Sequence, residues 1–302
     1  MKKFIFSVIL AMALAPTSMA QVPDALPVMN DNISYVPVYD SRDAALQAKL
    51  TQEINARPQW KSLVAKKKMS VALVNISDPA YPKYAALNGE HTMYAASMPK
   101  IAILLAVFQK IHDGELEDTP ELRADMTAMI RVSSNVAATK MIDAAGGLDA
   151  VNSVLKNPAY KLYDPAHGGG LWVGKRYAKT GQRIGDPLYN ISHAASTMQV
   201  ARFYYMLATG RLVSPKASKD MLGILSEPGI NHKFVAGLHG QVDGSDIFRK
   251  SGSWRTYHAD SCIVWTEDGQ KFILVGIVES AQGGKILKDL VPVAETVLRT
   301  ES

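Results

Sequence analysis

The stretch Ser97-Met98-Pro99-Lys100 runs directly into Ile101–Phe108, a segment in which every side chain is apolar. An apolar run of this length without a polar face predicts a helix that is buried on all sides. Proline lacks a backbone N–H and fits a helix only in its first turn, so Pro99 marks the beginning of this helix. Ser97 is therefore expected at or just before the N-terminus of a buried helix.

Ser97 and Lys100 are three residues apart, which places both side chains on one face of the helix start. A serine hydroxyl becomes an effective nucleophile only beside a base. Burial lowers the pKa of a lysine, and a helix N-terminus disfavours a cation, so Lys100 can be that base. The backbone N–H of Ser97 is a candidate oxyanion donor. For this pair alone, a helix cap and a lysine that extends to solvent remain the alternative.

Strand-like segments lie at both ends of the chain, and helical segments lie between them. Apolar runs and alternation predict strands at residues 69–75, 84–87, 247–251, 260–266 and 271–279. Helical spacing is found at residues 42–54, 122–130, 136–145, 193–209 and 285–299. This order predicts an α/β fold of the α+β type. Its N- and C-terminal strands would form one antiparallel sheet with packed helices and an inserted all-helical lobe.

The first residues predict export. Lys2 and Lys3 precede a short apolar run, and Ser18-Met19-Ala20 fits a small-residue cleavage site, which indicates a signal peptide at residues 1–20. We expect the mature chain in the periplasm or outside the cell, without a transmembrane segment, because no later apolar run is long enough. Residues 21–41 are expected to form an extended arm, and residues 42–302 one domain with its helical lobe at about 106–230.

Composition excludes several classes of protein. With 47% hydrophobic and 20% charged residues, the 302-residue chain is typical of a globular fold. The net charge of +5 is small and no basic stripe is interleaved with aromatics, so no nucleic-acid partner is expected. The seven His show no ligand spacing, and the single Cys262 is interpreted as a buried, inert thiol. We expect a monomer with no metal and no cofactor.

Two further motifs follow Ser97 and Lys100 along the chain. Ser133-Ser134-Asn135 ends one predicted helix, where a hydroxyl and an amide can point into a cleft. Lys250-Ser251-Gly252 ends a predicted strand. Helix capping is the alternative for the first motif, and an exposed strand end is the alternative for the second. Three such motifs in this order are hard to obtain by chance, so we interpret them as one site.

In these residues the sequence resembles the class A serine β-lactamases and the related penicillin-binding DD-peptidases. The resemblance extends from about Ala45 to Leu298. The Ser-x-x-Lys motif of that family matches here without change, and its Lys-Thr/Ser-Gly motif matches at residues 250–252. Its Ser-Asp-Asn motif matches at residues 133–135 with Ser134 in place of the middle Asp.

The resemblance implies the chemistry. Ser97 would attack a carbonyl carbon and form an acyl-enzyme, Lys100 would take or relay the proton, and Ser133 would pass a proton to the leaving nitrogen. The substrate would be a small molecule, either a β-lactam whose amide is opened or a D-Ala-D-Ala-type peptide. The expected activity is that of an exported serine hydrolase.

The resemblance also implies substrate contacts. The side-chain amide of the substrate would be held by Asn135, and its carboxylate would be attracted by the motif at residues 250–252. The N–H groups of Ser97 and Ser253 would form the oxyanion hole. Arg255 follows the third motif and is a candidate for carboxylate binding, with a solvent-facing role as the alternative. The expected binding residues are Asn135, Lys250, Ser251, Gly252, Ser253 and Arg255.

One departure from the family concerns release of the acyl group. Class A enzymes carry Glu-x-x-x-Asn after the second motif, and that Glu activates the hydrolytic water. Residues 136–196 of this chain contain no Glu. Asp186, which has Asn190 at the same spacing, and Asp164 are the candidate bases, and a plain turn role is the alternative for both. We therefore expect acylation to be retained and deacylation to be slow.

The missing Glu keeps two other functions open. One is a DD-peptidase-like enzyme, or an esterase or amidase, that acts on peptidoglycan stem peptides. The other is a penicillin-binding sensor that remains acylated and does not turn over.

Overall fold

The computed structural model describes residues 22–23, 26–28, 35–240, 242–266, 269 and 271–299. The predicted signal peptide lies outside the described residues, as does much of the predicted arm. The described parts of the arm lie against the body of the molecule: Leu26 is buried, and the N–H of Val28 donates to the carbonyl of Ala208 at 2.7 Å. A short 3-10 helix, η1 (Val38–Asp40), follows and buries Val38.

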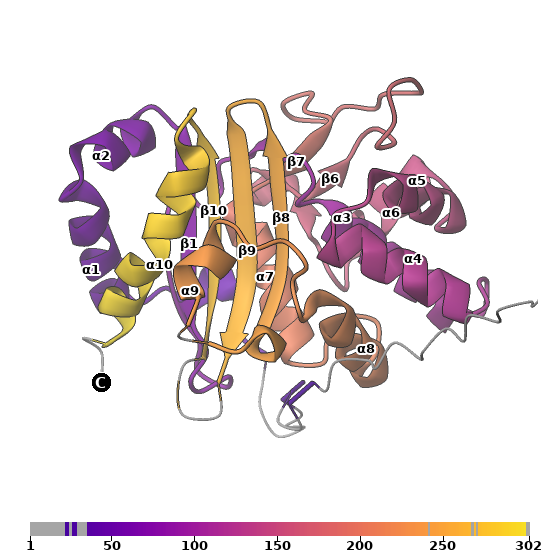
Figure 1. The fold of residues 1–302 in the computed structure, drawn as a ribbon, viewed down its shortest axis with the longest axis horizontal. Coiled ribbons are helices and arrows are strands. Elements are labelled where there is room, and N and C mark those ends of the chain that lie inside the picture. Colours follow the sequence, from indigo (N-terminus) through magenta and orange to yellow (C-terminus); the bar gives the residue numbers. More distant parts are fainter. Residues whose placement is uncertain are drawn as a thin grey trace, which may run out of the picture.

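One antiparallel sheet of five strands, in the order β2-β1-β10-β9-β8, forms the centre of the molecule (Figure 1). Two of these strands precede the helical lobe in sequence and three follow it, which confirms the prediction that N- and C-terminal strands form one sheet. Nearly every residue of the central strands is buried, because helices cover both faces. The strands are β1 (Met69–Asn75), β2 (Lys83–Leu87), β8 (Ile247–Trp254), β9 (Tyr257–Trp265) and β10 (Lys271–Glu279).

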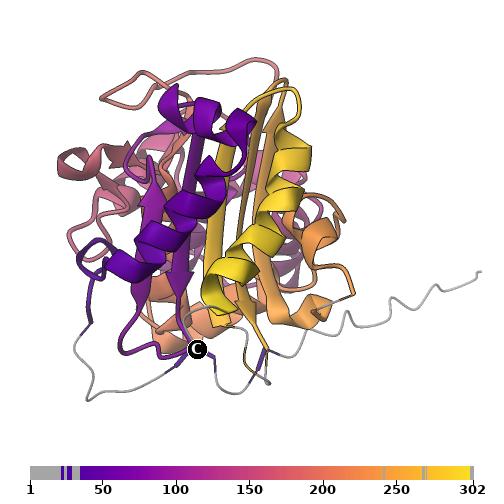
Figure 2. The ribbon, with the colours of Figure 1, turned by 90° about the vertical axis from the view of Figure 1, so that its left-hand side faces the viewer.

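One face of the sheet is covered by helices from both chain ends, which Figure 2 shows side by side. Close packing there depends on Gly276 of β10, because a Cβ at this position would lie 2.5 Å from Leu287 Cδ2. Burial of this apolar layer stabilises the fold by about 25 cal/mol for each Å² removed from water. The helices are α1 (Ala44–Asn55), α2 (Pro58–Ala65), α9 (Phe234–Leu238) and α10 (Gly283–Arg299).

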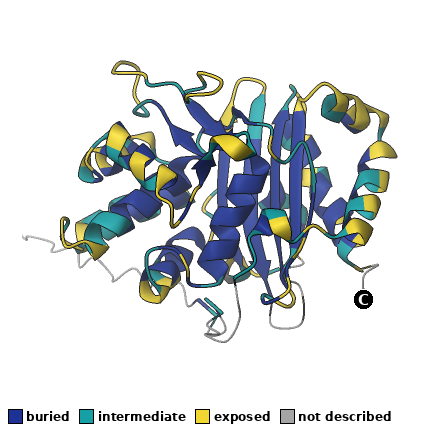
Figure 3. Cartoon of the chain, turned by 180° about the vertical axis from the view of Figure 1, so that it is seen from behind, coloured by how far each residue is buried: buried dark blue, intermediate teal, exposed yellow. Residues whose placement is uncertain are grey.

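On the other face α7 (Thr197–Ala208) packs against the sheet, and α3 (Lys100–His112) and the helical lobe belong to the same apolar core (Figure 3). Every residue from Lys100 to Phe108 is buried, as the apolar run predicts. Every residue of α7 is buried as well. The inserted helical lobe is confirmed, and it contains α4 (Pro120–Arg131), α5 (Asn135–Ala144), α6 (Leu148–Lys156) and α8 (Pro215–Leu225).

Short strands and turns occupy the region between the lobe and the sheet. The prediction of helix from residue 193 was wrong at its first residues, because His193–Ala195 is a strand (β7) that pairs with β3 (Met93–Tyr94). This pairing overrides the local helical pattern, and α7 begins only after Ser196. The remaining short elements are β4 (Tyr163–Asp164), η2 (Pro165–His167), β5 (Gly169–Gly170), β6 (Trp172–Val173) and η3 (Gly244–Asp246).

Cys262 is fully buried in β9, and burial raises the pKa of its thiol, which agrees with an inert side chain. None of the helices in the described ranges is long and apolar enough to cross a membrane.

Candidate active site

Ser97 lies in the turn between β3 and α3, and this turn packs closely against strand β8. The turn is closed by the N–H of Met98, which donates to the carbonyl of Ala95 at 3.0 Å. A Cβ on Gly252 of β8 would lie 2.2 Å from that carbonyl oxygen and 2.7 Å from Ser97 N. Only glycine permits this approach, so the third motif places its backbone directly beside the nucleophile's turn. The side chain of Ser97 remains partly exposed.

Lys100, in the first turn of α3, is fully buried. Its Nζ donates to the carbonyl of Ser133 at 2.6 Å and to Oδ1 of Asn135 at 2.9 Å, and it lies 4.5 Å from the centre of the Tyr177 ring. Burial lowers the pKa of Lys100 to about 7. A lysine with this pKa is partly neutral near pH 7, which a general base requires. Within the described residues, Ser97 Oγ forms no hydrogen bond, and its hydroxyl is open to the cavity.

The second motif presents two polar side chains to Lys100 and uses the third as a cap. Ser134 caps α5, because its side chain accepts from the N–H of Ala137 at 3.2 Å. Ser133 takes a left-handed conformation with φ 58°, which turns its carbonyl and hydroxyl toward the lysine. Helix capping thus applies to the middle residue alone. Serine and aspartate cap helices about equally well, which explains how the changed residue is accommodated.

Lys250 of β8 contacts the same hydroxyl as Lys100 does. Its Nζ donates to Ser133 Oγ at 3.0 Å, and Lys100 Nζ lies 3.3 Å from that oxygen. Lys250 is fully buried, and burial together with the charge of Lys100 holds its pKa well below the usual range. The Ser133 hydroxyl therefore bridges two buried amines, a geometry in which a proton can move between groups without crossing solvent.

A buried ion pair fixes the strand that carries the third motif. Arg249 of β8 bonds Asp260 of β9 through two contacts of 2.7 Å, and both side chains are buried. Asp260 also accepts from the N–H of Phe234 at 3.1 Å, which holds the start of α9 against the sheet. No sequence motif predicts this pair. Its only signal was a charge inside an apolar strand pattern, at Arg249.

Two side chains before α9 complete the support of this strand, and the sequence motifs did not indicate either. Lys233 is buried, and its Nζ donates to the carbonyl of Gly252 at 2.6 Å and to Ser253 Oγ at 2.7 Å. Burial lowers the pKa of Lys233 to about 8. His232 Nε2 lies 3.2 Å from Ser251 Oγ. The residues beside the nucleophile on β8 are thus held in place by side chains behind them.

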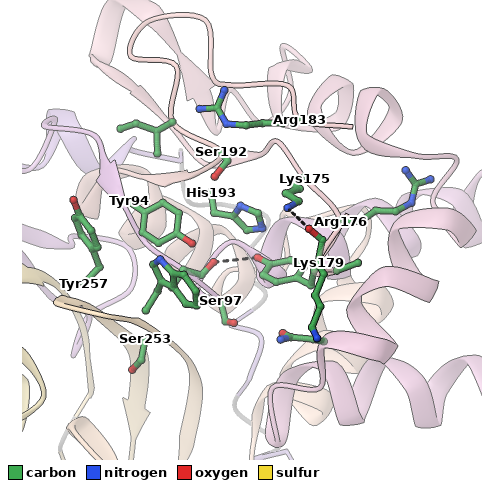
Figure 4. Close-up of a pocket in the computed structure, with 16 residues that line it drawn as sticks. Tyr94, Ser97, Lys175, Arg176, Lys179, Arg183, Ser192, His193, Ser253 and Tyr257 are labelled. Atoms are coloured by element: carbon green, nitrogen blue, oxygen red, sulfur yellow. Dashed lines mark hydrogen bonds between the residues drawn. The ribbon is translucent and has the colours of Figure 1, made fainter. Parts of the chain in front are cut away.

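A cavity of about 790 Å³ opens beside Ser97 (Figure 4). His193 lies in its wall with an unpaired Nδ1, edge-on to the Tyr177 ring at 4.4 Å, and burial lowers the pKa of this His to about 4. No Asp or Glu is among the described residues that line it. The lining residues are Tyr94, Ala96, Ser97, Asn135, Lys175, Arg176, Tyr177, Ala178, Lys179, Arg183, Ile191, Ser192, His193, Ser253, Trp254 and Tyr257.

The structure does not bring the two candidate Asp bases to this cavity. Asp186 is buried, and its carboxylate accepts from three backbone N–H groups of its own turn at 2.6–3.1 Å and from the hydroxyl of Tyr163 at 3.2 Å. Asp164 accepts from the N–H of Ala166 at 3.0 Å and begins η2. Both carboxylates therefore serve turns in this structure, as the alternative interpretation holds.

Arg255 is also outside the cavity lining. It lies at the turn between β8 and β9 with φ 50°, exposed, and its guanidinium lies 5.4 Å from the Trp254 ring. The other predicted residues, by contrast, meet around one point: Ser97, Lys100, Ser133, Asn135, Lys250, Ser251, Gly252 and Ser253.

Most of the chain matches one protein family. A sequence profile of the Beta-lactamase enzyme family matches residues 49–125 and 117–295. The chain belongs to the β-lactamase enzyme family. Among curated protein sequences, none matches this β-lactamase-family chain.

Solved structures show the same fold. A point mutant of PBP-A, solved as an acyl-enzyme complex with penicillin G, superposes with a TM-score of 0.64 at 17% identity, covering 86% of this chain and 98% of that one. A β-lactamase from Sphaerobacter thermophilus gives 0.62 at 17% identity, with 83% and 95% covered. A class A β-lactamase from Bacteroides cellulosilyticus gives 0.63 at 18% identity, with 85% and 100% covered. This β-lactamase-family chain therefore has the class A β-lactamase fold.

Proposed function

We propose that the protein is an exported serine hydrolase that opens the β-lactam amide through an acyl-enzyme on Ser97. The observation that carries this proposal is the buried amine of Lys100, one helical turn from Ser97, with its pKa lowered to about 7. A positioned base of this kind typically accelerates a reaction by about 10²–10⁴-fold. The predicted signal peptide supports a location in the periplasm or outside the cell.

During acylation, the groups around Lys100 would act one after another. Neutral Lys100 takes the proton of Ser97 as its oxygen attacks the carbonyl carbon. The charged Lys100 then returns a proton through the Ser133 hydroxyl, which lies 3.3 Å from it, to the leaving nitrogen as the amide bond breaks. The N–H groups of Ser97 and Ser253 would stabilise the oxyanion, and each such donor is worth about 3 kcal/mol.

Substrate binding would use the other two motif groups. Asn135 accepts from Lys100 through Oδ1, which leaves its amide N–H₂ to donate to the side-chain amide of the substrate. A substrate carboxylate beside Lys250 and Ser251 would raise the pKa of Lys250 again, because an opposite charge favours the protonated amine. Substrate binding and protonation of the Lys250 amine are thus coupled.

Deacylation would be slow. No carboxylate lines the cavity among the described residues, so the hydrolytic water would lack a carboxylate base and would depend on Lys100, which its own hydrogen bonds hold toward Ser133 and Asn135. This observation favours two alternative functions. One is a DD-peptidase-like or esterase-type enzyme that acts on stem peptides, and the other is a sensor that remains acylated. Each of these retains the same acyl-enzyme and differs from the first candidate in its release.

Intact mass after exposure to benzylpenicillin, followed over time, tests the proposal. We expect the full mass of the penicillin to be added at Ser97, with slow return to the free protein. Ser97→Ala should remove the adduct, and Ser62→Ala, on the exposed side of α2, should keep it. An adduct that persists in Ser97→Ala contradicts the assignment. An adduct that never decays favours the sensor, and release of D-alanine from a stem peptide favours the DD-peptidase.

A further inference from the structure

We propose that the hairpin at residues 174–184, here called the basic hairpin, forms an anion-binding subsite of the cavity. It would accept a carboxylate on the acyl side of the scissile amide. This inference deepens the proposed function and rests on it for the position of that amide. The hairpin is closed by the N–H of Ile184, which donates to the carbonyl of Gly174 at 2.6 Å, and by a β-bridge between Lys175 and Arg183.

The bridge places two cations on one face of the basic hairpin. Residues directly opposite each other in an antiparallel pair project to the same side, and like charges in that position repel. Lys175 and Arg183 have no carboxylate partner in the described part of the chain. Lys175 donates to the carbonyl of Lys179 at 3.2 Å, and Arg183 donates to the side-chain amide oxygen of Asn190 at 2.8 Å. A bound anion would relieve this repulsion.

Lys179 adds a third cation and Arg176 provides the contrast. The side chain of Lys179 extends from the loop into the cavity, whereas that of Arg176 turns aside to the helical lobe (Figure 4). There Arg176 pairs with Asp143 of α5, which neutralises it. The charge on the cavity wall is therefore carried by three cations. No carboxylate balances them among the described lining residues.

The position of the cavity indicates which part of a substrate reaches these cations. The proposed partners of the substrate carboxylate, Lys250 and Ser251, are not in the cavity lining, whereas Asn135, the proposed partner of the acyl side-chain amide, is. The cavity thus receives the substituent beyond that amide. The rings of Tyr94, Trp254 and Tyr257, which line the same cavity, suit an aromatic or peptide group that carries the carboxylate.

The expected effect is moderate, because Lys179 and Arg183 are exposed and Lys175 is only half-buried. An exposed ion pair changes an equilibrium constant by about 1.4-fold to fivefold, so three cations in the middle of this range together give about tenfold at low salt. The effect should weaken as salt rises, since the screening length is about 8 Å at physiological ionic strength.

The test measures binding without chemistry, on the Ser97→Ala protein. Benzylpenicillin and its α-carboxy analogue differ only by one carboxylate, and we expect the analogue to bind about tenfold more tightly at low salt. The double variant Lys175→Gln/Lys179→Gln should lose most of that preference. Lys61→Gln, an exposed lysine on α2, is the matched control and should keep it.

A second pair of ligands distinguishes the source of the carboxylate. Acyl peptides that end in D-Ala-D-Ala and carry either Glu or Gln before them repeat the comparison with a peptide. A preference in either pair that the double variant removes supports the subsite, and the pair that shows it identifies the source. Equal affinities within both pairs, or a preference that survives the double variant, overturn it. A separate measurement, the intact mass of the parent protein after exposure to penicillin, tests the proposed function, which fails if no adduct forms.

Discussion

The two walls that meet at Ser97 differ in how their polar groups find partners. One wall, here called the motif wall, is formed by the three motifs at residues 97–100, 133–135 and 250–252. In it Lys100 and Lys250 are buried, and the Nζ of each lies within 3.3 Å of the Ser133 hydroxyl. On the other wall, here called the loop wall and formed by residues 164–190, Lys179 and Arg183 are exposed, and the Asp186 carboxylate accepts hydrogen bonds from its own turn. Groups fixed before the substrate arrives need no reorganisation during reaction. The proposed acylation would therefore use groups that are already in place, whereas the described residues of the cavity offer no carboxylate for the proposed release.

The largest expected effect comes from breaking the motif wall at Lys100. Lys100→Ala should slow acylation by about 10²–10⁴-fold, because the base next to Ser97 is lost. Lys100→Met keeps most of the volume and should show the same loss if the alanine variant folds poorly. Lys110→Met, in the last turn of the same helix and half-buried, is the control and should acylate normally. Normal acylation in Lys100→Met would remove Lys100 from the mechanism. Stopped-flow acylation kinetics measure the effect.

The pH dependence of acylation tests the same wall without a substitution. Burial lowers the pKa of Lys100 to about 7, and the neutral amine is the form that accepts a proton. The acylation rate should therefore fall about tenfold for each pH unit below 7 and level off above it. A rate that stays constant from about pH 5 to pH 9 would show that the buried amine is not the base.

The two Asp residues test whether the loop wall supplies the hydrolytic base. Asp186→Asn weakens the acceptor of three backbone N–H groups, so we expect a stability loss of about 1–2 kcal/mol in urea unfolding. Because neither carboxylate reaches the cavity, we expect Asp186→Asn and Asp164→Asn to leave the acyl-enzyme lifetime near that of the parent. A clearly longer lifetime in either variant, measured by intact mass, would mean that the loop rearranges in the acyl-enzyme and that the Asp acts there.

The sequence predicted the motif wall well, because each motif is local. The spacing of Ser97 and Lys100, together with the apolar run after them, was sufficient to predict a lysine buried beside a serine at a helix start. The support behind β8 could not be predicted in this way. Lys233 and Asp260 contact their partners only when the α9 region packs against the sheet, and no local sequence pattern predicts that contact.

The loop wall shows the limit of spacing alone. Asp186 and Asn190 reproduce the spacing of the family's Glu and Asn, yet the turn that Asp186 closes directs its carboxylate to the backbone. At β7, similarly, the helical pattern that begins at His193 gives way to pairing with β3. In both places a few tertiary hydrogen bonds outweigh a weak local preference. The antiparallel sheet itself was predictable, since long apolar runs at both chain ends require burial on both faces.

The smallest expected effect concerns Ser134, where the chain departs from the family within the motif wall. Its side chain caps α5 and faces neither lysine, so Ser134→Asp, which restores the family residue, should change stability by only a few tenths of a kcal/mol. Ser134→Ala should cost about 1 kcal/mol, because the N–H of Ala137 loses its acceptor. Acylation should change little in both variants once folding is complete. If Ser134→Asp instead changes acylation by more than about tenfold, the middle residue acts on the amines of Lys100 and Lys250 through its charge. The hydrogen bonds of the motif wall would then not be sufficient to explain the state of the two amines.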